Sequence, residues 1–219
     1  MSTRRKKPQT SPRTTAAAAP RRLPVGPIIG VVVAVVLVVT IVFTFGEDDD
    51  APLEVGSPAI TGEALPIFDA AATDASVGMP APEVTGTDWN GTPVSITDDG
   101  RAKILVFLAH WCPVCQDEVP IITSWLSAGL LPEGVDMYTV ATAISRVRDN
   151  YPPSEWLERE GWEPPVILDD EAGTAAAAFG LPAYPYFVFV KADGTVAGRI
   201  SGRLEAGTLT ALAQSLVEQ

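Results

Sequence analysis

Cys112 and Cys115 are the only cysteines of the 219-residue chain, and two residues separate them. An apolar segment predicted as a strand, residues 103–109, precedes them, and a helical pattern, residues 112–128, begins at the first cysteine. Unpaired N–H groups and the dipole at a helix N-terminus stabilise a thiolate, so Cys112 is predicted to be a nucleophile. Pro113 suits the first helical turn, where no N–H is needed. Cys115, one turn further along, is predicted to attack a mixed disulfide on Cys112 and release the product.

Other uses of the two cysteines stay open at this point. A structural disulfide is possible outside the cytoplasm, although a bridge across so short a loop constrains the unfolded chain very little. A zinc site needs about four ligands, and His110 is the only histidine. Two thiolates could hold Cu(I) in a tethered metal chaperone or binding module, but Met79 and Met137 are far away in sequence. A peroxiredoxin is disfavoured because Ala109 stands where such proteins carry Thr or Ser. We expect redox chemistry with no metal ion and no cofactor.

The elements that must position the cysteines follow from short apolar runs that alternate with helical patterns from residue 78 onward. Besides the strand and helix around the cysteines, the predicted strands are 135–143, 165–168, 186–191 and 196–201, and the predicted helices are 154–161, 171–179 and 205–217. The last two strands flank Ala192-Asp-Gly, which is a hairpin turn signal. Strands that alternate with helices and end in a hairpin predict an α/β fold with a mixed sheet.

Several segments together resemble the thioredoxin superfamily and, within it, the membrane-tethered TlpA/ResA/CcmG-like group. They are the lead-in 78–83, the segment 88–94, the strand with its motif 105–115, the helix start 115–120 and the segment 179–185. The resemblance covers residues 78–218. It implies a thioredoxin-like three-layer α/β/α sandwich with a mixed sheet, and a thiol–disulfide oxidoreductase that works through a mixed disulfide.

The resemblance also suggests roles for residues near the cysteines. Pro185 matches the family's cis-proline, which faces the cysteines and presents backbone to an extended substrate; Tyr184 before it would narrow substrate access or stack on a partner. Glu118 matches the group's acidic residue, and its place three residues beyond Cys115 would let it accept the proton of that thiol. Trp111 is expected to cover the site and contact substrates. The alternatives are a trans proline, an exposed helical acid and a tryptophan that only packs.

The direction of electron flow is less determined. The resemblance favours a protein-disulfide reductase, often one of cytochrome c maturation, whereas proline directly after the nucleophile also occurs in strongly oxidising relatives. A disulfide-donating oxidase of the same fold is therefore the alternative, as is a scaffold whose disulfide never turns over. His110 could tune Cys112 electrostatically, but we expect an exposed loop histidine. Because the chain has no further cysteine, a separate membrane or extracellular redox partner must exchange electrons with it.

The N-terminal segment 25–45 has 21 residues without a charge, long enough to cross a bilayer as one transmembrane helix. Basic residues before it and acidic residues after it predict a cytoplasmic N-terminus and an extracytoplasmic C-terminal domain. A cleaved signal peptide would need a shorter apolar core. We expect a membrane-anchored chain with a basic tail (1–24), the transmembrane helix, an acidic linker (46–77) and a thioredoxin-like domain (78–219). Residues 65–68 could dock on the domain as a strand or plug.

Charge excludes one class of partner. The net charge is −12, and residues 1–46 contribute seven basic and no acidic side chains. Residues 47–219 therefore carry 8 basic and 27 acidic side chains, a net charge of −19. Such a body repels phosphate, so nucleic acid is not a partner. The expected partners are protein disulfides or dithiols.

Overall fold

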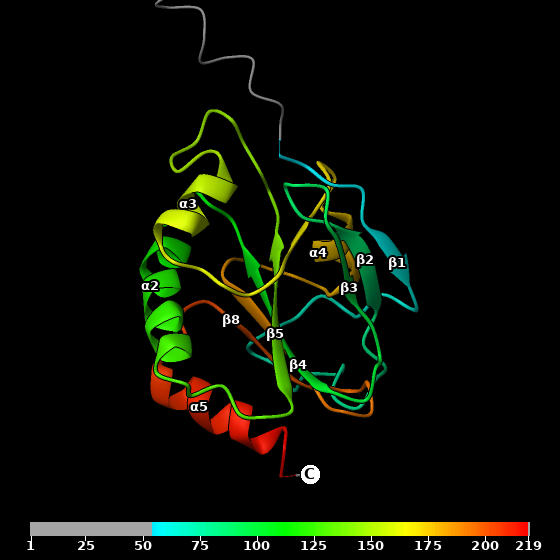
Figure 1. Ribbon diagram of the computed structural model, residues 1–219. Helices are drawn as coiled ribbons and strands as arrows, with labels where there is room; N and C mark the ends of the chain where they lie inside the picture. The colour runs from blue at the N-terminus through cyan, green and yellow to red at the C-terminus, as the bar shows by residue number, and fades with distance from the viewer. Residues whose placement is uncertain (1–53, 219) are drawn as a thin grey trace, which may run out of the picture. The chain divides into compact units, whose positions relative to one another are not determined.

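The computed structural model describes residues 54–218, shown in colour in Figure 1. The predicted basic tail and transmembrane helix, and the first part of the predicted linker, lie outside the described residues. Within the described part of the chain, every helix is too short or too polar to cross a membrane.

A five-stranded mixed sheet forms the centre of the fold, in the order β6-β5-β4-β7-β8. Its strands are β4 (Ala102–Leu108), β5 (Val135–Ala141), β6 (Val166–Leu168), β7 (Tyr186–Val190) and β8 (Val196–Ser201). The pairs β4–β5 and β5–β6 are parallel, whereas β4–β7 and β7–β8 are antiparallel. The predicted mixed sheet is confirmed. Because β4 and β5 run in parallel, the residues that follow them meet at one edge of the sheet.

Three helices cover one face of this sheet: α2 (Pro113–Ser127), α3 (Pro153–Arg159) and α5 (Ala206–Ser215) (Figure 1). Strand side chains alternate between faces, and Ile104, Val106 and Leu108 of β4 point to this side. They join one buried apolar cluster with Trp125 of α2 and Leu209 of α5. This packing places the start of α2, and with it the cysteines, directly after the central strand.

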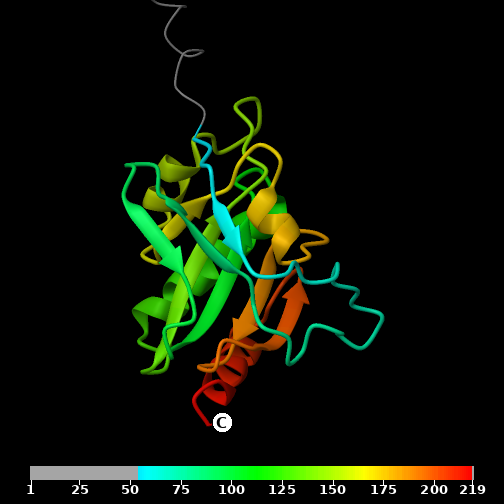
Figure 2. The same ribbon diagram turned by 90° about the vertical axis from the view of Figure 1, so that its right-hand side faces the viewer.

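The other face is covered by α4 (Thr174–Ala178) and by a small antiparallel sheet, which crosses it in Figure 2. Its strands are β1 (Ala59–Thr61), β2 (Glu83–Thr87) and β3 (Pro93–Ile96). Leu105 and Phe107 of β4 pack here in a second cluster with Val84, Ile96 and Phe179. One outer layer therefore combines a helix with strands, where the resemblance predicted helices.

Residues 54–77, assigned from the sequence to the linker, lie on the domain in this structure. Strand β1 pairs with β2, and Leu65 is only 4% exposed, with its N–H donating to the carbonyl of Ala178 at 2.8 Å. A close approach requires glycine at 180, since a Cβ there would lie 2.2 Å from the carbonyl oxygen of Pro66. Asp74 accepts from Arg199 Nε at 2.9 Å in a mostly buried ion pair. These contacts make the segment a part of the fold.

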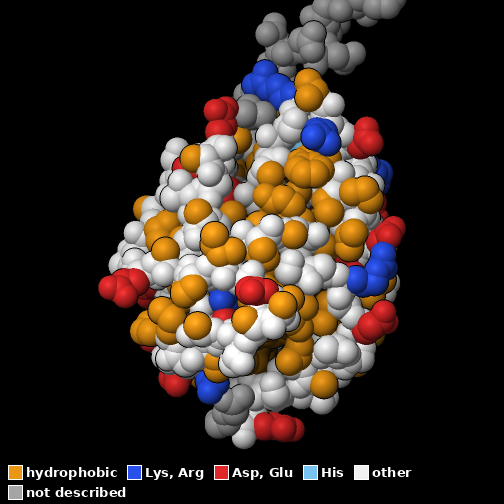
Figure 3. All heavy atoms as spheres, turned by 180° about the vertical axis from the view of Figure 1, so that it is seen from behind, with side chains coloured by type: hydrophobic (Ala, Val, Ile, Leu, Met, Phe, Trp, Pro, Cys, Tyr) orange, Lys and Arg blue, Asp and Glu red, His pale blue; other side chains and the backbone are white. Residues whose placement is uncertain are grey.

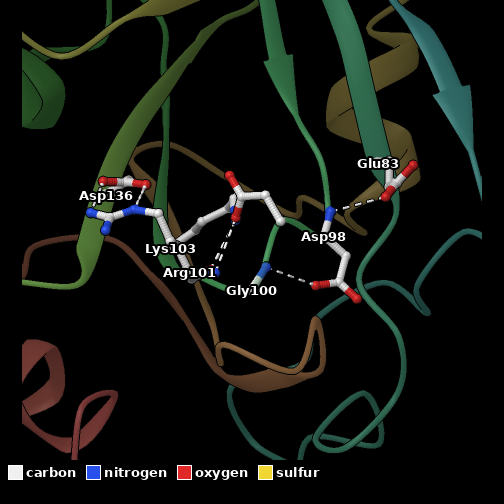
Figure 4. A network of polar contacts seen from close by, with 7 residues as sticks. Glu83, Asp98, Gly100, Arg101, Lys103 and Asp136 are labelled. Carbon is white, nitrogen blue, oxygen red and sulfur yellow. Dashed lines mark hydrogen bonds and ion pairs between the residues drawn. The ribbon is translucent and has the colours of Figure 1, made fainter.

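A polar network occupies the amino-terminal end of β4, far from the cysteines along the strand (Figure 4). Arg101 donates to both carboxylate oxygens of Asp136, at 2.7 and 2.6 Å. The buried ammonium of Lys103 pairs with Asp99. Two of the few basic side chains of the domain are thus neutralised by acids at this end.

Candidate active site

The two thiols lie where β4 ends and α2 begins. Cys112 is the N-cap residue of α2, with φ −77° and ψ 119°, and Pro113 follows as the first helical residue. The N–H of Cys112 donates to the carbonyl of Ala109 at 2.9 Å, which closes the turn between strand and helix. Both cysteines carry free thiols; Cys112 is 8% exposed and Cys115 is fully buried. Cys112 is therefore the thiol that another molecule can reach.

The segment before β7 lies against the first thiol. Pairing of Phe107 with Tyr186 places Pro185 beside the end of β4. The Tyr184–Pro185 peptide bond is cis, which confirms the predicted isomer. Cys112 Sγ lies 3.7 Å from the carbonyl oxygen of Tyr184. The backbone at this position is thus close enough to align a chain that approaches the thiol.

Cys115 is held as a neutral thiol. Burial raises its pKa far above the ordinary value, and its hydrogen bond with Cys112 and the nearby carboxyl of Glu118 act in the same direction. A thiol with a raised pKa keeps its proton until a base takes it. The second cysteine therefore needs a proton acceptor before it can attack.

Glu118 lies on α2 one turn beyond Cys115, and its side chain is fully buried. Its Oε1 accepts the N–H of Leu204 at 3.0 Å, whereas Oε2 has no hydrogen-bond partner among residues 54–218. Burial raises the pKa of this carboxyl, and the Leu204 N–H opposes the shift. Its neighbour Asp117 is exposed and pairs with Arg203 at 2.7 Å. Glu118 is thus not an exposed helical acid, and one of its oxygens is free to take a proton.

Trp111 and Tyr184 flank Cys112 as half-buried aromatic side chains. Their ring centroids are 6.0 Å apart in an edge-to-face arrangement. Trp111 Nε1 donates to the carbonyl of Ala143 at 2.7 Å. Burial raises the pKa of Tyr184. The structure thus brings together all six residues that the sequence singled out: the two cysteines, Glu118, Trp111, Tyr184 and Pro185.

The expectation for His110 was wrong, because the side chain is buried rather than exposed. The Ser145 N–H donates to Nε2 at 3.1 Å, and Nδ1 lies 2.7 Å from the carbonyl oxygen of Asp149. These partners require a neutral ring with its proton on Nδ1, and burial lowers the pKa of His110 accordingly. Both nitrogens are occupied by backbone. Within residues 54–218, no group of three His, Cys, Asp or Glu side chains could hold a metal ion.

The sequence did not reveal the loop that His110 holds, residues 142–152 between β5 and α3. Ala143 and Asn150 have positive φ values of 51° and 59°, and the Tyr151–Pro152 peptide bond is cis. Arg148 Cζ lies 4.7 Å from the ring centroid of Trp111. The one feature of the sequence that could have placed this loop near the cysteines is that it follows a strand predicted to lie in the same sheet as β4.

Comparisons with known proteins agree with this fold. The model of the Redoxin family matches residues 76–216. The soluble secreted antigen MPT53 of Mycobacterium tuberculosis is 24% identical over 132 residues, which cover 58% of this chain and 66% of that protein. The crystal structure of a secreted M. tuberculosis disulfide oxidoreductase homologous to E. coli DsbE is 24% identical, with a TM-score of 0.51, covering 60% of this chain and 95% of that one. A thioredoxin family thiol:disulfide interchange protein from Chlorobium tepidum is 23% identical, with a TM-score of 0.54 and coverage of 66% and 99%.

Proposed function

This chain belongs to the Redoxin family, and we propose that it is an extracytoplasmic thiol–disulfide oxidoreductase that reduces protein disulfides. The carrying observation is a reachable thiol at a helix N-terminus with a buried, protonated thiol one turn behind it. Secreted and disulfide-exchanging relatives support the assignment. We place the chain at the membrane, held by residues 25–45, with residues 1–24 in the cytoplasm. The linker then ends before residue 54, where contacts with the domain begin.

The reaction has two exchange steps. The Cys112 thiolate attacks one sulfur of the substrate disulfide; that S–S bond breaks, and the leaving sulfur takes up a proton. Cys115 then attacks Cys112 Sγ, which releases the second substrate thiol and leaves a Cys112–Cys115 disulfide. Two electrons pass to the substrate, so a dithiol partner in the membrane or outside it must reduce the protein before the next cycle. As in cytochrome c maturation, the substrates are proteins whose cysteines must be kept reduced outside the cytoplasm.

Glu118 supplies the base for the second step in this proposal. Cys115 is buried and holds its proton, and Glu118 Oε2 is buried without a partner among the described residues. Burial favours the neutral carboxyl once the proton has moved. Trp111 and Tyr184 cover the sulfur, and the backbone at Pro185 aligns the incoming chain.

The surroundings of the Cys112 sulfur bear on the direction of electron flow. A dithiol becomes a strong oxidant when its reduced, thiolate form is strongly stabilised. Here Cys112 Sγ faces the Tyr184 carbonyl and the Cys115 thiol, and among residues 54–218 neither of these hydrogen-bond partners is a charged side chain. His110 adds no positive charge, since its ring is neutral. The lack of a charged hydrogen-bond partner among these residues favours a reductase.

The decisive measurement is the reduction potential of the Cys112–Cys115 pair in the full chain, equilibrated in glutathione buffers. We expect a value near or below about −220 mV, in the range of thioredoxins and glutaredoxins. A value near about −120 mV would instead make the protein a donor of disulfides. Stoichiometric copper retention by the reduced protein, lost in Cys112→Ser, would favour the metal-chaperone alternative.

A further inference from the structure

The β5–α3 loop (residues 142–152) lies beside the reactive thiol. It follows β5, whose last residue, Ala141, pairs in parallel with Leu108 of β4. The cysteine motif follows the same end of β4, so loop and motif share one edge of the sheet. In Figures 1 and 2 the loop projects beyond that edge.

Residues next to Cys112 hold this loop in place. The ring of His110 forms hydrogen bonds with the backbone of Ser145 and Asp149. Trp111 Nε1 donates a hydrogen bond to the Ala143 carbonyl. Asn150 Nδ2 donates to the His110 carbonyl at 3.5 Å. Hydrogen bonds at both its ends restrict the loop, which lowers the entropy cost of binding a partner.

The tip of the loop exposes Arg146, Val147 and Arg148 to solvent, and Val147 is 93% exposed. The Arg148 guanidinium lies over the ring of Trp111, the residue that precedes Cys112. On the face seen in Figure 3, basic and apolar side chains lie next to each other at this upper end of the domain. The loop therefore presents two positive charges and an apolar side chain within reach of a chain bound at the thiol.

These charges stand out against the rest of the domain. Residues 54–218 contain 8 basic and 23 acidic side chains, a net charge of −15. Four of the eight form ion pairs: Arg101, Lys103, Arg199 and Arg203. Within the same range, neither arginine of the loop has a carboxylate partner, although Asp149 is adjacent in sequence.

We propose that the β5–α3 loop is a specificity-determining surface that binds an acidic segment of the protein substrate next to its disulfide. The inference rests on the proposed function and names the substrate class of that site. At an ionic strength of 0.1 M, charges interact over about 10 Å. An acidic segment beside the thiol therefore senses the two arginines, together with Asp149 of the same loop and Glu54 near His110, more than the other acids of the body. Arginine also binds carboxylates through two parallel hydrogen bonds.

The test compares two disulfide-linked peptides that are identical except for two glutamates or two lysines beside the cystine. The reduced full chain, in a neutral detergent, is mixed with each peptide under single-turnover conditions, and released peptide thiol is followed by chromatography. Uncharged bis(2-hydroxyethyl) disulfide serves as a third substrate. We expect the acidic peptide to react about tenfold faster than the basic one at low salt, with the preference fading as salt is added.

The double variant Arg146→Glu, Arg148→Glu should lose or invert the preference and keep the wild-type rate with the uncharged disulfide. Lys191→Glu is the control for charge reversal away from the site: it reverses one positive charge at the opposite end of β7, half the change of the double variant, and it should leave the preference intact.

Equal rates of both peptides with the wild type would overturn the inference, as would a Lys191→Glu effect at least half as large as that of the double variant, because it makes half the change of charge. Arginine-dependent binding to phosphatidylglycerol vesicles without any peptide preference would assign the loop to lipid instead and also refute it. A protein that oxidises with none of the three disulfides would refute the proposed function itself, which separates the two failures.

Discussion

Replacing Glu118 by glutamine removes the carboxylate that we propose takes the proton of Cys115, and it changes the shape of the side chain very little. The amide oxygen can still accept the Leu204 N–H, which Oε1 accepts at 3.0 Å. The position of Oε2, which has no partner among the described residues, becomes an NH₂ group that cannot accept a proton. The variant therefore tests proton transfer with the fold retained.

The size of the effect follows from burial. A positioned general base contributes about 10²–10⁴-fold to a proton-transfer step. Cys115 is fully buried and its pKa is raised by burial, so bulk water is a poor substitute acceptor. We expect Glu118→Gln to slow release of the product from the mixed disulfide by about 100-fold or more. Formation of the mixed disulfide should change little, because only Cys112 acts in that step.

The pH dependence of the free energy of unfolding gives a second test of Glu118, and the direction of the change can be predicted. Burial raises the pKa of Glu118 above its ordinary value of 4.5, so the neutral carboxyl stabilises the fold at low pH. That contribution is lost as the pH rises through the raised pKa. Relative to Glu118→Gln, the wild type should therefore lose about 1–3 kcal/mol of unfolding free energy as the pH rises above 4.5, the cost of an unsatisfied buried group.

The assay is a stopped-flow experiment with a peptide disulfide that separates the two steps, combined with urea unfolding at several pH values. Asp117→Asn is the matched control, because it removes the neighbouring exposed acid of the same helix. It should affect neither step by more than about twofold, in line with the small effects of surface changes. Wild-type release kinetics in Glu118→Gln, or an equal loss in Asp117→Asn, would refute the role of Glu118 as the base.

Three further changes test other parts of the structure. Cys115→Ser should abolish turnover and accumulate the mixed disulfide with the substrate, visible on non-reducing gels, because no second thiol can resolve it. Leu65→Ala should cost about 2–5 kcal/mol in urea unfolding if the segment before residue 78 is part of the core; Ile67→Ala, at a position 77% exposed, should cost almost nothing. Asp74→Asn should cost about 3–5 kcal/mol by leaving the buried Arg199 without its partner. The Arg199 hydrogen bond lowers the pKa of Asp74, so in the wild type the stability from this pair should be lost only as the pH falls below 3.8, the ordinary value.

The central sheet and its helices could be predicted because their signals are local. Strand β4 is buried along its whole length, and its residues 104–108 read as one continuous apolar run, and α2 begins with a proline at its first turn. The small sheet could not be predicted in the same way. Its strands have three to five residues, too few to establish an alternating pattern, and β2 contains Gly86. That glycine allows close packing, since a Cβ there would lie 2.9 Å from Ile167.

The same distinction between local and distant signals holds for the residues of the site. The identity of the reacting sulfurs is readable from two cysteines at a strand-to-helix junction, because strand and helix are adjacent in sequence. The burial and hydrogen bonding of the groups around these sulfurs depend on segments that are distant in sequence. Glu118 has its hydrogen bond from Leu204, 86 residues away, and His110 is buried by a loop that begins more than 30 residues later. One-dimensional patterns thus predict which atoms react, whereas the proton path and the substrate surface depend on tertiary contacts. For this reason substitutions in the β5–α3 loop, and at Glu118 with its oxygen that has no partner among residues 54–218, test what the sequence alone does not predict.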